Sequence, residues 1–584
     1  MALKGAFRTK KLDDILAAAE ERGERVGLKR TLGPVNLTLL GIGAVIGAGI
    51  FATVGSAAAG DPETLRPGAG PSLMLSFVIT AVVCGFTALC YAEFASMVPI
   101  SGSAYTYSYA TLGELVAWII GWDLMIEYAI GNVAVAISWS NYFRSLLDSL
   151  GVHLPFWMCT DAQTAARMVA ENPELAAQAP HLFGVPVYFN FLAFAIVMLI
   201  TAVLVKGIRE SAGFNAVMVI IKILILMFFV GVALWYFSPR EMAANWTPFQ
   251  PNGWKGTLTG AAVVFFSYIG FDAVSTVAEE TRNPGRDLPV GIFASLGICT
   301  LIYMVVAAVF TGLVPYHDIL TWTEAEKAEP LTKALGGIAP AWTSVIVGLG
   351  AVVATTAVLL VFQLGQPRIF YSMARDGLLP PVFARVHPRY RTPHITTILT
   401  GLVVGVLAGF TTIDEMVSLT NIGTLFAFVL VCIGIIVLRY KEPGRPRPFR
   451  VPLGPWFLPG LGVLSCVGLM IYLPPSSWWR FIGWLTLGLS VYWSYGHARS
   501  VLRRRPGVVP RTPGPLRLMG LGFLWMALAL FIVPHDANPR ELLAILGDAA
   551  ALHHARTLIA ALLFGAGLAS VSLGLLTARR APLQ

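Results

Sequence analysis

Residues 37–55, LTLLGIGAVIGAGIFATVG, form an apolar stretch that is rich in glycine. The glycines are Gly41, Gly43, Gly47, Gly49 and Gly55. The length suits a membrane span, because about 20 apolar residues cross the hydrocarbon core of a bilayer. Glycine disfavours a continuous helix, so we expect a break near the middle of the span that exposes backbone N–H and C=O groups.

A plainer interpretation of these glycines also stays open. Gly43-x-x-x-Gly47 fits a seam at which two membrane helices pack closely. A dinucleotide-binding fingerprint does not fit, because the spacing is not G-x-G-x-x-G and no strand precedes the run.

The composition of the whole chain agrees with a membrane protein. Of 584 residues, 56% are hydrophobic and 12% charged, whereas a soluble domain carries about 25% charged residues. Apolar runs long enough to span a bilayer recur along the chain, which predicts an all-α integral membrane protein with about 14 transmembrane helices. The predicted spans are 35–57, 72–98, 113–149, 186–205, 211–237, 257–280, 288–315, 343–373, 395–411, 415–438, 455–473, 479–498, 516–533 and 556–577.

The distribution of Lys and Arg predicts the orientation of these spans. With the N-terminus inside, 30 of the 41 basic residues fall in cytoplasmic segments or at their ends and ten on the external side. This excess predicts that both termini are cytoplasmic. It also accounts for most of the net charge of +9, so a nucleic-acid partner is not expected.

The chain divides into six predicted segments. Residues 439–454 form a linker rich in Pro and Arg, and repeated Pro prevents a helix from continuing through it. The segments are 1–34, cytoplasmic and amphipathic; 35–438, a core of ten spans; 439–454, a cytoplasmic linker; 455–498, spans 11 and 12; 499–515, a basic cytoplasmic linker; and 516–584, spans 13 and 14 with the tail.

A second interrupted span lies at 259–280, TGAAVVFFSYIGFDAVSTVAEE, where Ser267, Tyr268, Gly270 and Asp272 break an apolar run. At 1.5 Å per residue, Gly47 lies about 18 Å into span 1 and Gly270 about 20 Å into span 6. Both breaks therefore fall near the midplane, on spans of opposite direction. They open two successive groups of five spans, where an inverted-repeat transporter places its discontinuous helices and its substrate.

Two isolated charges lie at a similar depth. Lys222 has no charged neighbour within ten residues, and Glu127 lies in the run 121–136. A charge at the centre of a membrane helix costs about 2.5–3.5 kcal/mol unless it is paired or neutral. We therefore predict a protonatable pair whose charge state is coupled to substrate or conformation. A structural ion pair or a satisfied buried hydrogen bond is the alternative.

Three motifs occur in order, LKRTLGPVNLTLLGIGAVIGAGIF at 28–51, FFSYIGFDAVSTVAEETRNPGRDLPVGI at 265–292 and GQPRIFYSMARDGLLPPVFARVHPRYRTP at 365–393. Together they resemble the cationic amino acid transporter family of the amino acid–polyamine–organocation (APC) superfamily. The resemblance covers roughly residues 11–505. It implies a leucine-transporter-like (LeuT-like) core, with helices 1–5 and 6–10 as inverted repeats. Helices 11 and 12 would flank this core, with 13 and 14 an additional pair.

The resemblance also implies the site residues. The substrate carboxylate would bind backbone N–H groups at Gly47, Ala48 and Gly49, with Ala48 standing where some relatives carry Thr. Lys222 would serve in proton coupling, with Glu127 near the pocket and the proton route. The amine would meet carbonyls of both broken segments, at Val45, Ile46, Phe266, Ser267 and Ile269, and Gly270 would also contact the substrate. The substrate side chain would meet Asn132, Asp272 and Val358, although Asp272 also suits a helix cap.

The expected function is therefore proton-coupled import of L-amino acids across the plasma membrane, the inner membrane in a bacterium, by alternating access. The open alternatives are an uncoupled uniporter or exchanger of cationic amino acids and an amino acid sensor. An enzyme is not expected, because no span carries HExxH or a convincing Ser/His arrangement. The expected partners are the L-amino acid, a proton and the lipid bilayer. No metal or cofactor is expected, and a small single-helix accessory subunit is left open.

Overall fold

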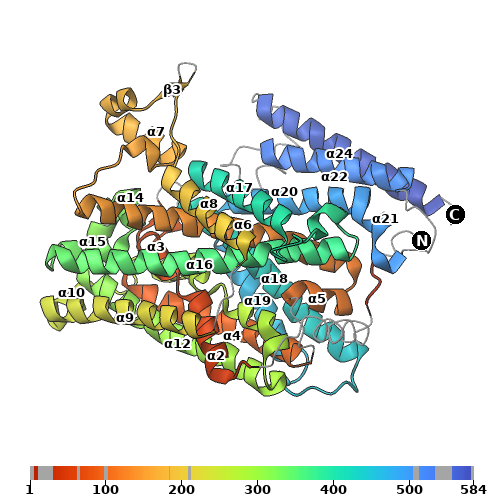
Figure 1. Ribbon diagram of the computed structural model, residues 1–584, viewed down its shortest axis with the longest axis horizontal. Coiled ribbons are helices and arrows are strands. Elements are labelled where there is room, and N and C mark those ends of the chain that lie inside the picture. The colour runs from red at the N-terminus through yellow and green to blue at the C-terminus, as the bar shows by residue number, and fades with distance from the viewer. Residues whose placement is uncertain are drawn as a thin grey trace.

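The computed structural model describes residues 6–10, 31–61, 66–97, 103–182, 185–207, 212–503, 512–532 and 555–580. These residues form long helices that run along the longest axis of the molecule (Figure 1). The strands are two short antiparallel pairs. They are β1 (Gly60–Asp61) with β2 (Arg66–Pro67), and β3 (His181–Leu182) with β4 (Val185–Pro186). The predicted helical class is confirmed.

The helices follow the order of the predicted spans. Spans 1–5 are α2 (Pro34–Val45), α3 (Ala48–Ala59), α4 (Leu73–Met97), α6 (Glu114–Ser149), α8 (Phe191–Lys206) and α9 (Ala212–Tyr236). Spans 6–10 are α11 (Gly253–Val264) with η5 (Phe265–Tyr268) and η6 (Phe271–Glu280), α12 (Pro284–Leu313), α16 (Ala341–Arg375), α17 (His394–Phe410) and α18 (Ile413–Lys441). After them come α19 (Phe457–Ile471), α20 (Pro475–Val491), η8 (Tyr492–Gly496), α21 (His497–Arg499), η9 (Val501–Arg503), α22 (Gly514–Ile532) and α24 (Ala555–Arg580).

Short elements connect these helices. They are η2 (Gly70–Ser72), α5 (Ser103–Thr111), η3 (Phe156–Met158), α7 (Ala162–Glu171), η4 (Pro173–Gln178), α10 (Pro239–Asn245), α13 (Tyr316–Thr321), α14 (Glu324–Lys327), α15 (Pro330–Gly336) and η7 (Pro381–Ala384). We call the end of the molecule with α7, α10, α14 and α15 the cap end, and the opposite end, with α5 and α21, the terminal end (Figure 1).

Each of the fourteen predicted stretches coincides with a helix or a broken helix. Within the described residues, seven helices are long and apolar enough to cross a membrane, or up to nine if each of two bent pairs counts as one span. Four predicted spans correspond to shorter apolar helices: Phe191–Lys206, His394–Phe410, Gly514–Leu530 and Leu562–Thr577. The total of about 14 spans and the cytoplasmic termini stay predictions.

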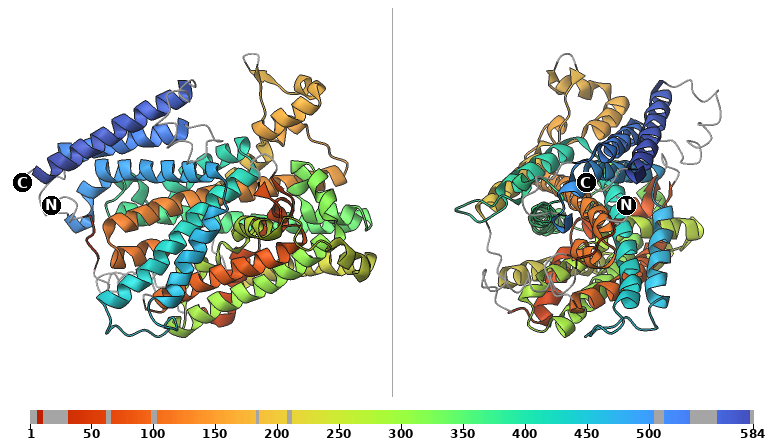
Figure 2. Two further views of the ribbon diagram at one scale, coloured as in Figure 1. Left: turned by 180° about the vertical axis from the view of Figure 1, so that it is seen from behind. Right: turned by 90° about the vertical axis from the view of Figure 1, so that its right-hand side faces the viewer.

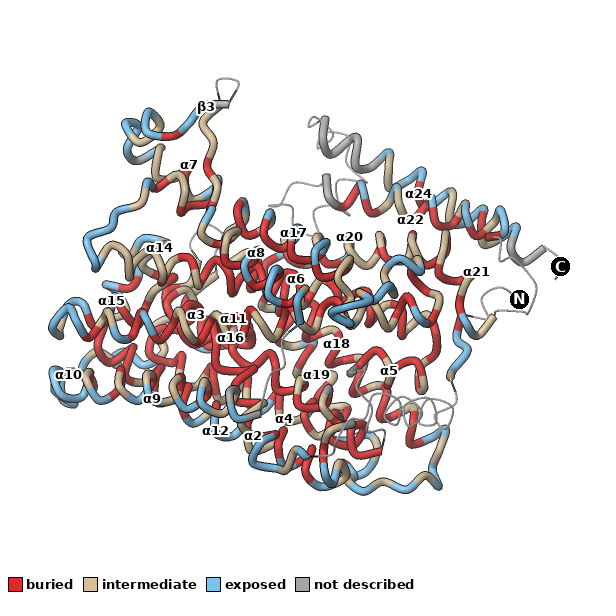
Figure 3. The backbone as a smooth tube through the Cα atoms, viewed as in Figure 1, coloured by how far each residue is buried: buried red, intermediate tan, exposed pale blue. Residues whose placement is uncertain are grey.

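Long helices of the bundle expose large apolar side chains on its surface. Helix α9 exposes Leu224 and Trp235, and α12 exposes Leu301. Contiguous exposed apolar side chains are unusual on a water-soluble protein and favour contact with lipid. The buried residues gather along the central helices, among them α3, α11 and α16 (Figure 3). Helices α22 and α24 pack against each other, and α22 packs against α20 (Figure 2).

The first span is broken where the glycines predicted. Helix α2 ends at Val45, Ile46 and Gly47 have extended backbone conformations, and α3 begins at Ala48 after a bend of 45°. The packing interpretation holds as well, because a Cβ on Gly43 would lie 2.9 Å from Cγ2 of Val219. The glycines therefore permit both the break and a close helix contact.

The sixth span is broken at Ile269–Gly270. Gly270 has a φ of +116°, a left-handed conformation that glycine adopts without steric cost and other residues avoid. The chain then continues as η6 rather than as a regular α-helix. Both predicted breaks are thus present in the structure.

Candidate substrate site at the two broken helices

The two breaks contact each other. A Cβ on Gly49 would lie 2.3 Å from Cα of Ser267, and one on Gly270 would lie 2.9 Å from the carbonyl oxygen of Ala44. Both approaches are too close for any larger residue. The structure therefore brings together the two interruptions that the sequence placed at one depth.

Tyr303, on α12, joins the two broken spans. Its hydroxyl lies 2.9 Å from the carbonyl oxygen of Val45 and 3.0 Å from that of Ser267, so its one hydrogen is shared between an acceptor on each span. The side chain is fully buried. Tyr303 is not recognisable from sequence, since a Tyr in an apolar run looks like an ordinary core side chain.

The start of α3 offers groups for an anion. The first N–H groups of a helix have no partner within it, and the helix dipole favours negative charge there. Oγ of Ser267 is buried, lies beside Gly49 and has no hydrogen-bond partner within the part of the chain described. Val358 covers the break, since a Cβ on Gly47 would lie 2.5 Å from its Cγ2. The N–H groups at the start of α3 and the hydroxyl of Ser267 are therefore donors of the kind that bind a carboxylate, and they lie side by side at the break.

Lys222 holds the other side of the first break. Its Nζ donates hydrogen bonds to the carbonyl oxygens of Gly43, at 2.8 Å, and Ile46, at 2.9 Å, and its side chain is fully buried. These carbonyls belong to the end of α2, where the helix dipole favours a positive charge. The structure thus places Lys222 at the break, as a hydrogen-bonded residue.

Several carbonyls that were predicted to meet the substrate amine already accept hydrogen bonds. Lys222 donates to Ile46, and Tyr303 donates to Val45 and Ser267. The carbonyl of Phe266 accepts from the N–H of Ile269 at 3.3 Å. A carbonyl oxygen has two lone pairs, so each can take a second donor.

Lys222 and Glu127 do not form an ion pair within the residues described. Glu127 lies on α6 beside Thr424 of α18 and interacts electrostatically with Asp272 of η6. Lys222 instead contacts the carbonyls of α2. Lys222 and Glu127 were predicted at a similar depth in the membrane, but their side chains contact different groups.

A group of buried carboxyls lies on α6 and η6. The side chains of Asp123, Glu127 and Asp272 are all 5% exposed or less. Both carboxylate oxygens of Asp123 and Oε2 of Glu127 lack a hydrogen-bond partner among the described atoms. Asp123 was not among the residues predicted from sequence, although it lies one helical turn before Glu127 in the same span.

The side chains of Asp272 and Asn132 differ in whether their polar atoms have hydrogen-bond partners. Asp272 lies in the first turn of η6, and its carboxylate accepts hydrogen bonds from backbone N–H groups that include those of Gly270 and Ala273. It therefore acts as a helix cap. Asn132 is fully buried, and neither atom of its amide has a partner within the described chain.

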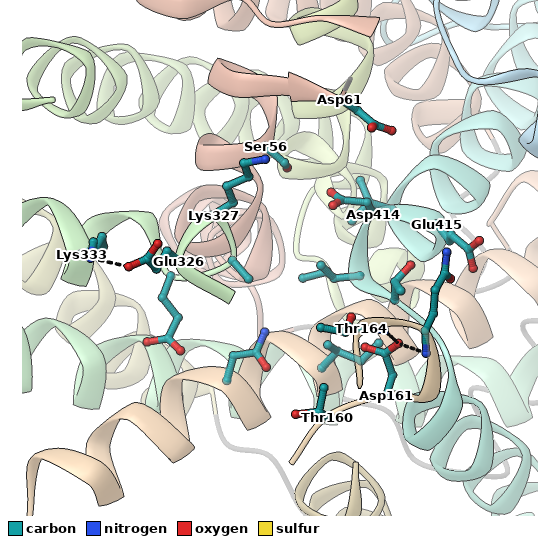
Figure 4. Close-up of a pocket in the computed structure, with 18 of the residues that line it drawn as sticks. Ser56, Asp61, Thr160, Asp161, Thr164, Glu326, Lys327, Lys333, Asp414 and Glu415 are labelled. Carbon is teal, nitrogen blue, oxygen red and sulfur yellow. Dashed lines mark hydrogen bonds and ion pairs between the residues drawn. The ribbon is translucent and has the colours of Figure 1, made fainter. Parts of the chain in front are cut away.

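A cavity of about 1270 Å³ opens at the cap end and reaches both broken spans (Figure 4). Ser56 and Ala57 of α3 line it, as do Thr259 and Val263 of α11. Its walls carry charges of both signs, and Figure 4 shows Lys327 and Lys333 on one side and Asp414 and Glu415 on another. The cavity therefore lies on the cap-end halves of both broken spans, and its lining does not include the residues of the breaks themselves.

The segment between α6 and α8 supplies part of the cavity wall. Its helix α7 begins after Asp161, whose Oδ1 accepts hydrogen bonds from the N–H groups of Gln163 and Thr164, both at 3.0 Å. Thr160 and Asp161 line the cavity (Figure 4). We found no motif in this segment from sequence, because its contribution depends on where the chain folds back.

Glu329, in the loop between α14 and α15, also lines the cavity. Burial raises the pKa of its carboxyl to about 8, an effect that the neighbouring Ser145 and Arg144 partly offset. The cavity wall therefore contains a titratable group near neutral pH.

A helical membrane protein whose two broken helices meet in its interior has the architecture of a secondary transporter. A family model described as amino acid permease matches residues 32–492. The chain belongs to the amino acid permease family.

Three relatives show the range of the similarity. The branched-chain amino acid permease BcaP of Bacillus subtilis (strain 168) is 44% identical over 503 residues, 86% of this chain and 100% of that protein. The methylthioribose transporter of the same organism is 41% identical over 505 residues, 86% of this chain and 100% of that protein. The vacuolar cationic amino acid transporter 4 of Arabidopsis thaliana is 37% identical over 418 residues, 71% of this chain and 64% of that protein.

These comparisons confirm the resemblance to the cationic amino acid transporters and the APC superfamily. The family and these relatives are transporters and not enzymes, as predicted. The family match ends at residue 492, so α22 and α24 lie outside it.

Proposed function

We propose that this protein is a secondary active transporter that imports an L-amino acid across the plasma membrane together with protons. The substrate lies between the two broken spans. The observation that carries the proposal is the start of α3, where buried and unpartnered Oγ of Ser267 lies against Gly49. A helix N-terminus with an additional hydroxyl donor suits the carboxylate that all amino acids share.

The orientation follows from the basic residues. The segments expected on the cytoplasmic side contain 30 of the 41 Lys and Arg, and they include α5 and α21 at the terminal end. We therefore propose that the terminal end faces the cytoplasm and the cap end faces outwards. An amino acid enters through the cavity at the cap end and reaches the breaks from outside. Movement of α2–α3 and α11–η6 relative to the other helices then opens the terminal end.

Lys222 is the group that we propose to couple the proton to this movement. When protonated, its ammonium binds Gly43 and Ile46 and holds the end of α2. Loss of the proton removes the charge that the helix dipole favours, and the end of α2 is then held less tightly. A proton on Lys222 thereby stabilises the form of the break that binds substrate.

Glu127 is a second candidate for proton transfer, because it is buried near Asp272 without a basic partner among the described residues. Asn132 and Val358 are proposed to contact the substrate side chain, since Val358 covers Gly47 and the amide of Asn132 is unpartnered. The carbonyls of Phe266 and Ile269 remain proposed contacts of the amine.

The relatives transport chemically different substrates, according to their names. They include branched-chain and cationic amino acids and methylthioribose. We therefore propose an L-amino acid as the substrate class and leave the side chain to a competition experiment.

The test uses purified protein in liposomes with a labelled amino acid and an alkaline lumen. We expect accumulation of label above the external concentration, and its loss when a protonophore removes the gradient. Uptake that is indifferent to pH would support the uncoupled uniporter or exchanger instead. Binding without any uptake or exchange would support a sensor. Competition by the twenty amino acids against one transported label then separates cationic from neutral substrates.

A further inference from the structure

Asn421, on α18, contacts the second broken span in the way that Lys222 and Tyr303 contact the first. Its Nδ2 donates hydrogen bonds to the carbonyl oxygens of Ala262, at 2.8 Å, and Val263, at 3.1 Å. Both acceptors lie in the last turn of α11, just before the chain changes to η5. A helix end leaves carbonyl oxygens to be satisfied by groups outside the helix, and α18 supplies such a donor here.

The amide of Asn421 also has an acceptor that is not used. Both of its partners are carbonyl oxygens, which only accept hydrogen bonds, so the nitrogen must face α11 and the oxygen must face elsewhere. The side chain is fully buried, and Oδ1 has no hydrogen-bond partner within the described chain. A buried acceptor without a partner is costly, so a donor that arrives with a ligand would be stabilised at this oxygen.

Asn421 lies next to the cavity at the cap end. Val417 and Ser418, one helical turn closer to the cap end on α18, line this cavity. Val263, whose carbonyl oxygen Asn421 contacts, also lines it. The side chain of Asn421 is therefore one turn further into the molecule than the cavity wall, at the end of α11.

Helix α18 packs along the second break on both of its sides. The ring centroid of Phe428 lies 5.7 Å from that of Phe265, in η5, and 5.3 Å from that of Phe271, in η6. These two rings belong to the segments before and after Gly270. Asn421 is thus part of a helix that forms a wall of the break, and not of a distant surface.

A second buried amide lies on the neighbouring helix α6. A Cβ on Gly131 would lie 3.5 Å from Cγ2 of Thr420, so Asn132 and Asn421 each follow a residue of this contact. Neither atom of the Asn132 amide has a partner within the residues described. The two helices therefore bring unpartnered amide atoms to one level of the bundle, beside the second break.

The acceptors beside Asn421 suit a group that has N–H donors and a positive charge. The end of α11 favours positive charge, because the helix dipole is negative there, and Oδ1 adds an acceptor without a charge of its own. The α-ammonium group of an amino acid meets both conditions. The donors that suit its carboxylate are close in sequence, since Ser267 follows Val263 by four residues.

We propose that Asn421 is a substrate-binding residue whose Oδ1 accepts a hydrogen bond from the ammonium group of the bound amino acid, while its Nδ2 holds the end of α11. This inference rests on the proposed function, because it requires an amino acid at the two breaks. A hydrogen bond to a charged group is about twice as strong as one between neutral groups. Loss of Oδ1 should therefore weaken ligands that carry the ammonium group more than ligands that lack it.

The test compares two ligands in wild type and in Asn421→Leu, which has a side chain of similar size without polar atoms. One ligand is the amino acid that competes most strongly for uptake in liposomes. The other is its desamino analogue, the carboxylic acid with hydrogen in place of the ammonium group. Both are measured by their Ki against the labelled substrate.

We expect the Ki of the amino acid to rise about tenfold or more in Asn421→Leu, as expected for loss of a hydrogen bond to a charged group. The Ki of the desamino analogue should change by less than about twofold, because it has no donor for Oδ1. Equal rises for the two ligands would show that Asn421 only holds α11, and this result would overturn the proposal. An unchanged Ki for the amino acid would overturn it as well.

Two further variants control for folding and for loss of an amide elsewhere. Asn421→Ser keeps a donor for the α11 carbonyls but lacks the amide oxygen, so it should fold and show the same selective loss. Asn245→Leu removes an amide whose Nδ2 donates to the carbonyl oxygen of Gly312 at 2.7 Å, on α10 and α12. This variant should leave both Ki values unchanged. Size-exclusion chromatography and Tm show that each variant is folded.

Wild-type uptake in liposomes separates this inference from the proposed function. Gradient-driven uptake by wild type, with the same Ki for the amino acid in wild type and Asn421→Leu, defeats the role of Asn421 alone. Absence of uptake for every amino acid defeats the proposed function.

Discussion

Both broken spans are interrupted in the interior of the molecule, but different groups stabilise the two interruptions. The first break has ordinary extended backbone at Ile46 and Gly47, and side chains from other helices, Lys222 and Tyr303, hold its carbonyls. The second break results from the left-handed backbone of Gly270, and the carboxylate of Asp272 caps the turn that follows. The conformation of the first break therefore depends on side chains of neighbouring helices, whereas that of the second also depends on the left-handed backbone of Gly270.

The largest expected effect is at the second break. Gly270→Ala forces a left-handed backbone on alanine, which costs about 1–3 kcal/mol. Its Cβ also lies 2.9 Å from the carbonyl oxygen of Ala44. We expect a large loss of folded, monodisperse protein and no transport, measured by size-exclusion chromatography and uptake. Gly231→Ala is the matched control, because a Cβ there has no neighbour within 4 Å. Normal folding of Gly270→Ala would show that the second break does not depend on the backbone of Gly270.

The next effect tests the first break. Lys222→Ala removes the donor to Gly43 and Ile46, and each buried carbonyl left unpaired costs about 1–3 kcal/mol. We expect folded protein with a lower Tm that no longer accumulates label under a pH gradient. Lys206→Ala, at the end of α8, should behave like wild type. Normal gradient-driven accumulation by Lys222→Ala would remove this lysine from the coupling.

A milder effect is expected from Gly47→Ala. Gly47 has a φ of −162°, which alanine also adopts, so the cost comes from the contact at 2.5 Å with Cγ2 of Val358. We expect a several-fold rise in the KM for the amino acid with folding retained. Gly47→Ala combined with Val358→Ala should recover much of the affinity. If the second substitution restores nothing, Val358 does not limit the space at this break.

The smallest effect concerns the cavity wall. Because burial raises the pKa of Glu329 from 4.5 to about 8, the folded protein keeps this proton over a range in which the unfolded chain has lost it. The stabilisation is complete below about pH 4.5 and is lost as the pH rises towards 8. Glu329→Gln should flatten this part of the dependence of Tm on pH. Asp318→Asn, at an exposed site on α13, is the control, and an equal slope in Glu329→Gln and wild type would contradict the assignment.

The sequence predicted the parts of the site that depend on local chemistry. Glycines in an apolar run indicated both breaks, and the rise per residue placed them at one depth. Lone charges in apolar spans indicated Lys222 and Glu127, since burying such charges is costly. These inferences needed only residue type, spacing and the thickness of a bilayer.

Other features depend on packing between distant segments. Lys222 and Glu127 were predicted as a pair because they share a depth, but depth does not fix rotation about the bundle axis. Lys222 contacts α2, and Glu127 lies near Asp272. Tyr303 was missed for the same reason, as nothing local shows which backbone its hydroxyl meets.

The sequence by itself determined that the chain is a helical membrane protein with two interrupted spans, because hydrophobic length and glycine placement act locally along the chain. The tertiary structure decided which groups satisfy the interrupted backbone, and it placed residues 6–10 against the start of α6 and Asp376. Such contacts join residues far apart in sequence, so they follow only from how the helices are rotated and packed. Lys222 illustrates both contributions. The sequence shows that a charged lysine lies in an apolar span, where its burial costs free energy, but only the structure shows that the carbonyl oxygens of Gly43 and Ile46 accept its hydrogen bonds.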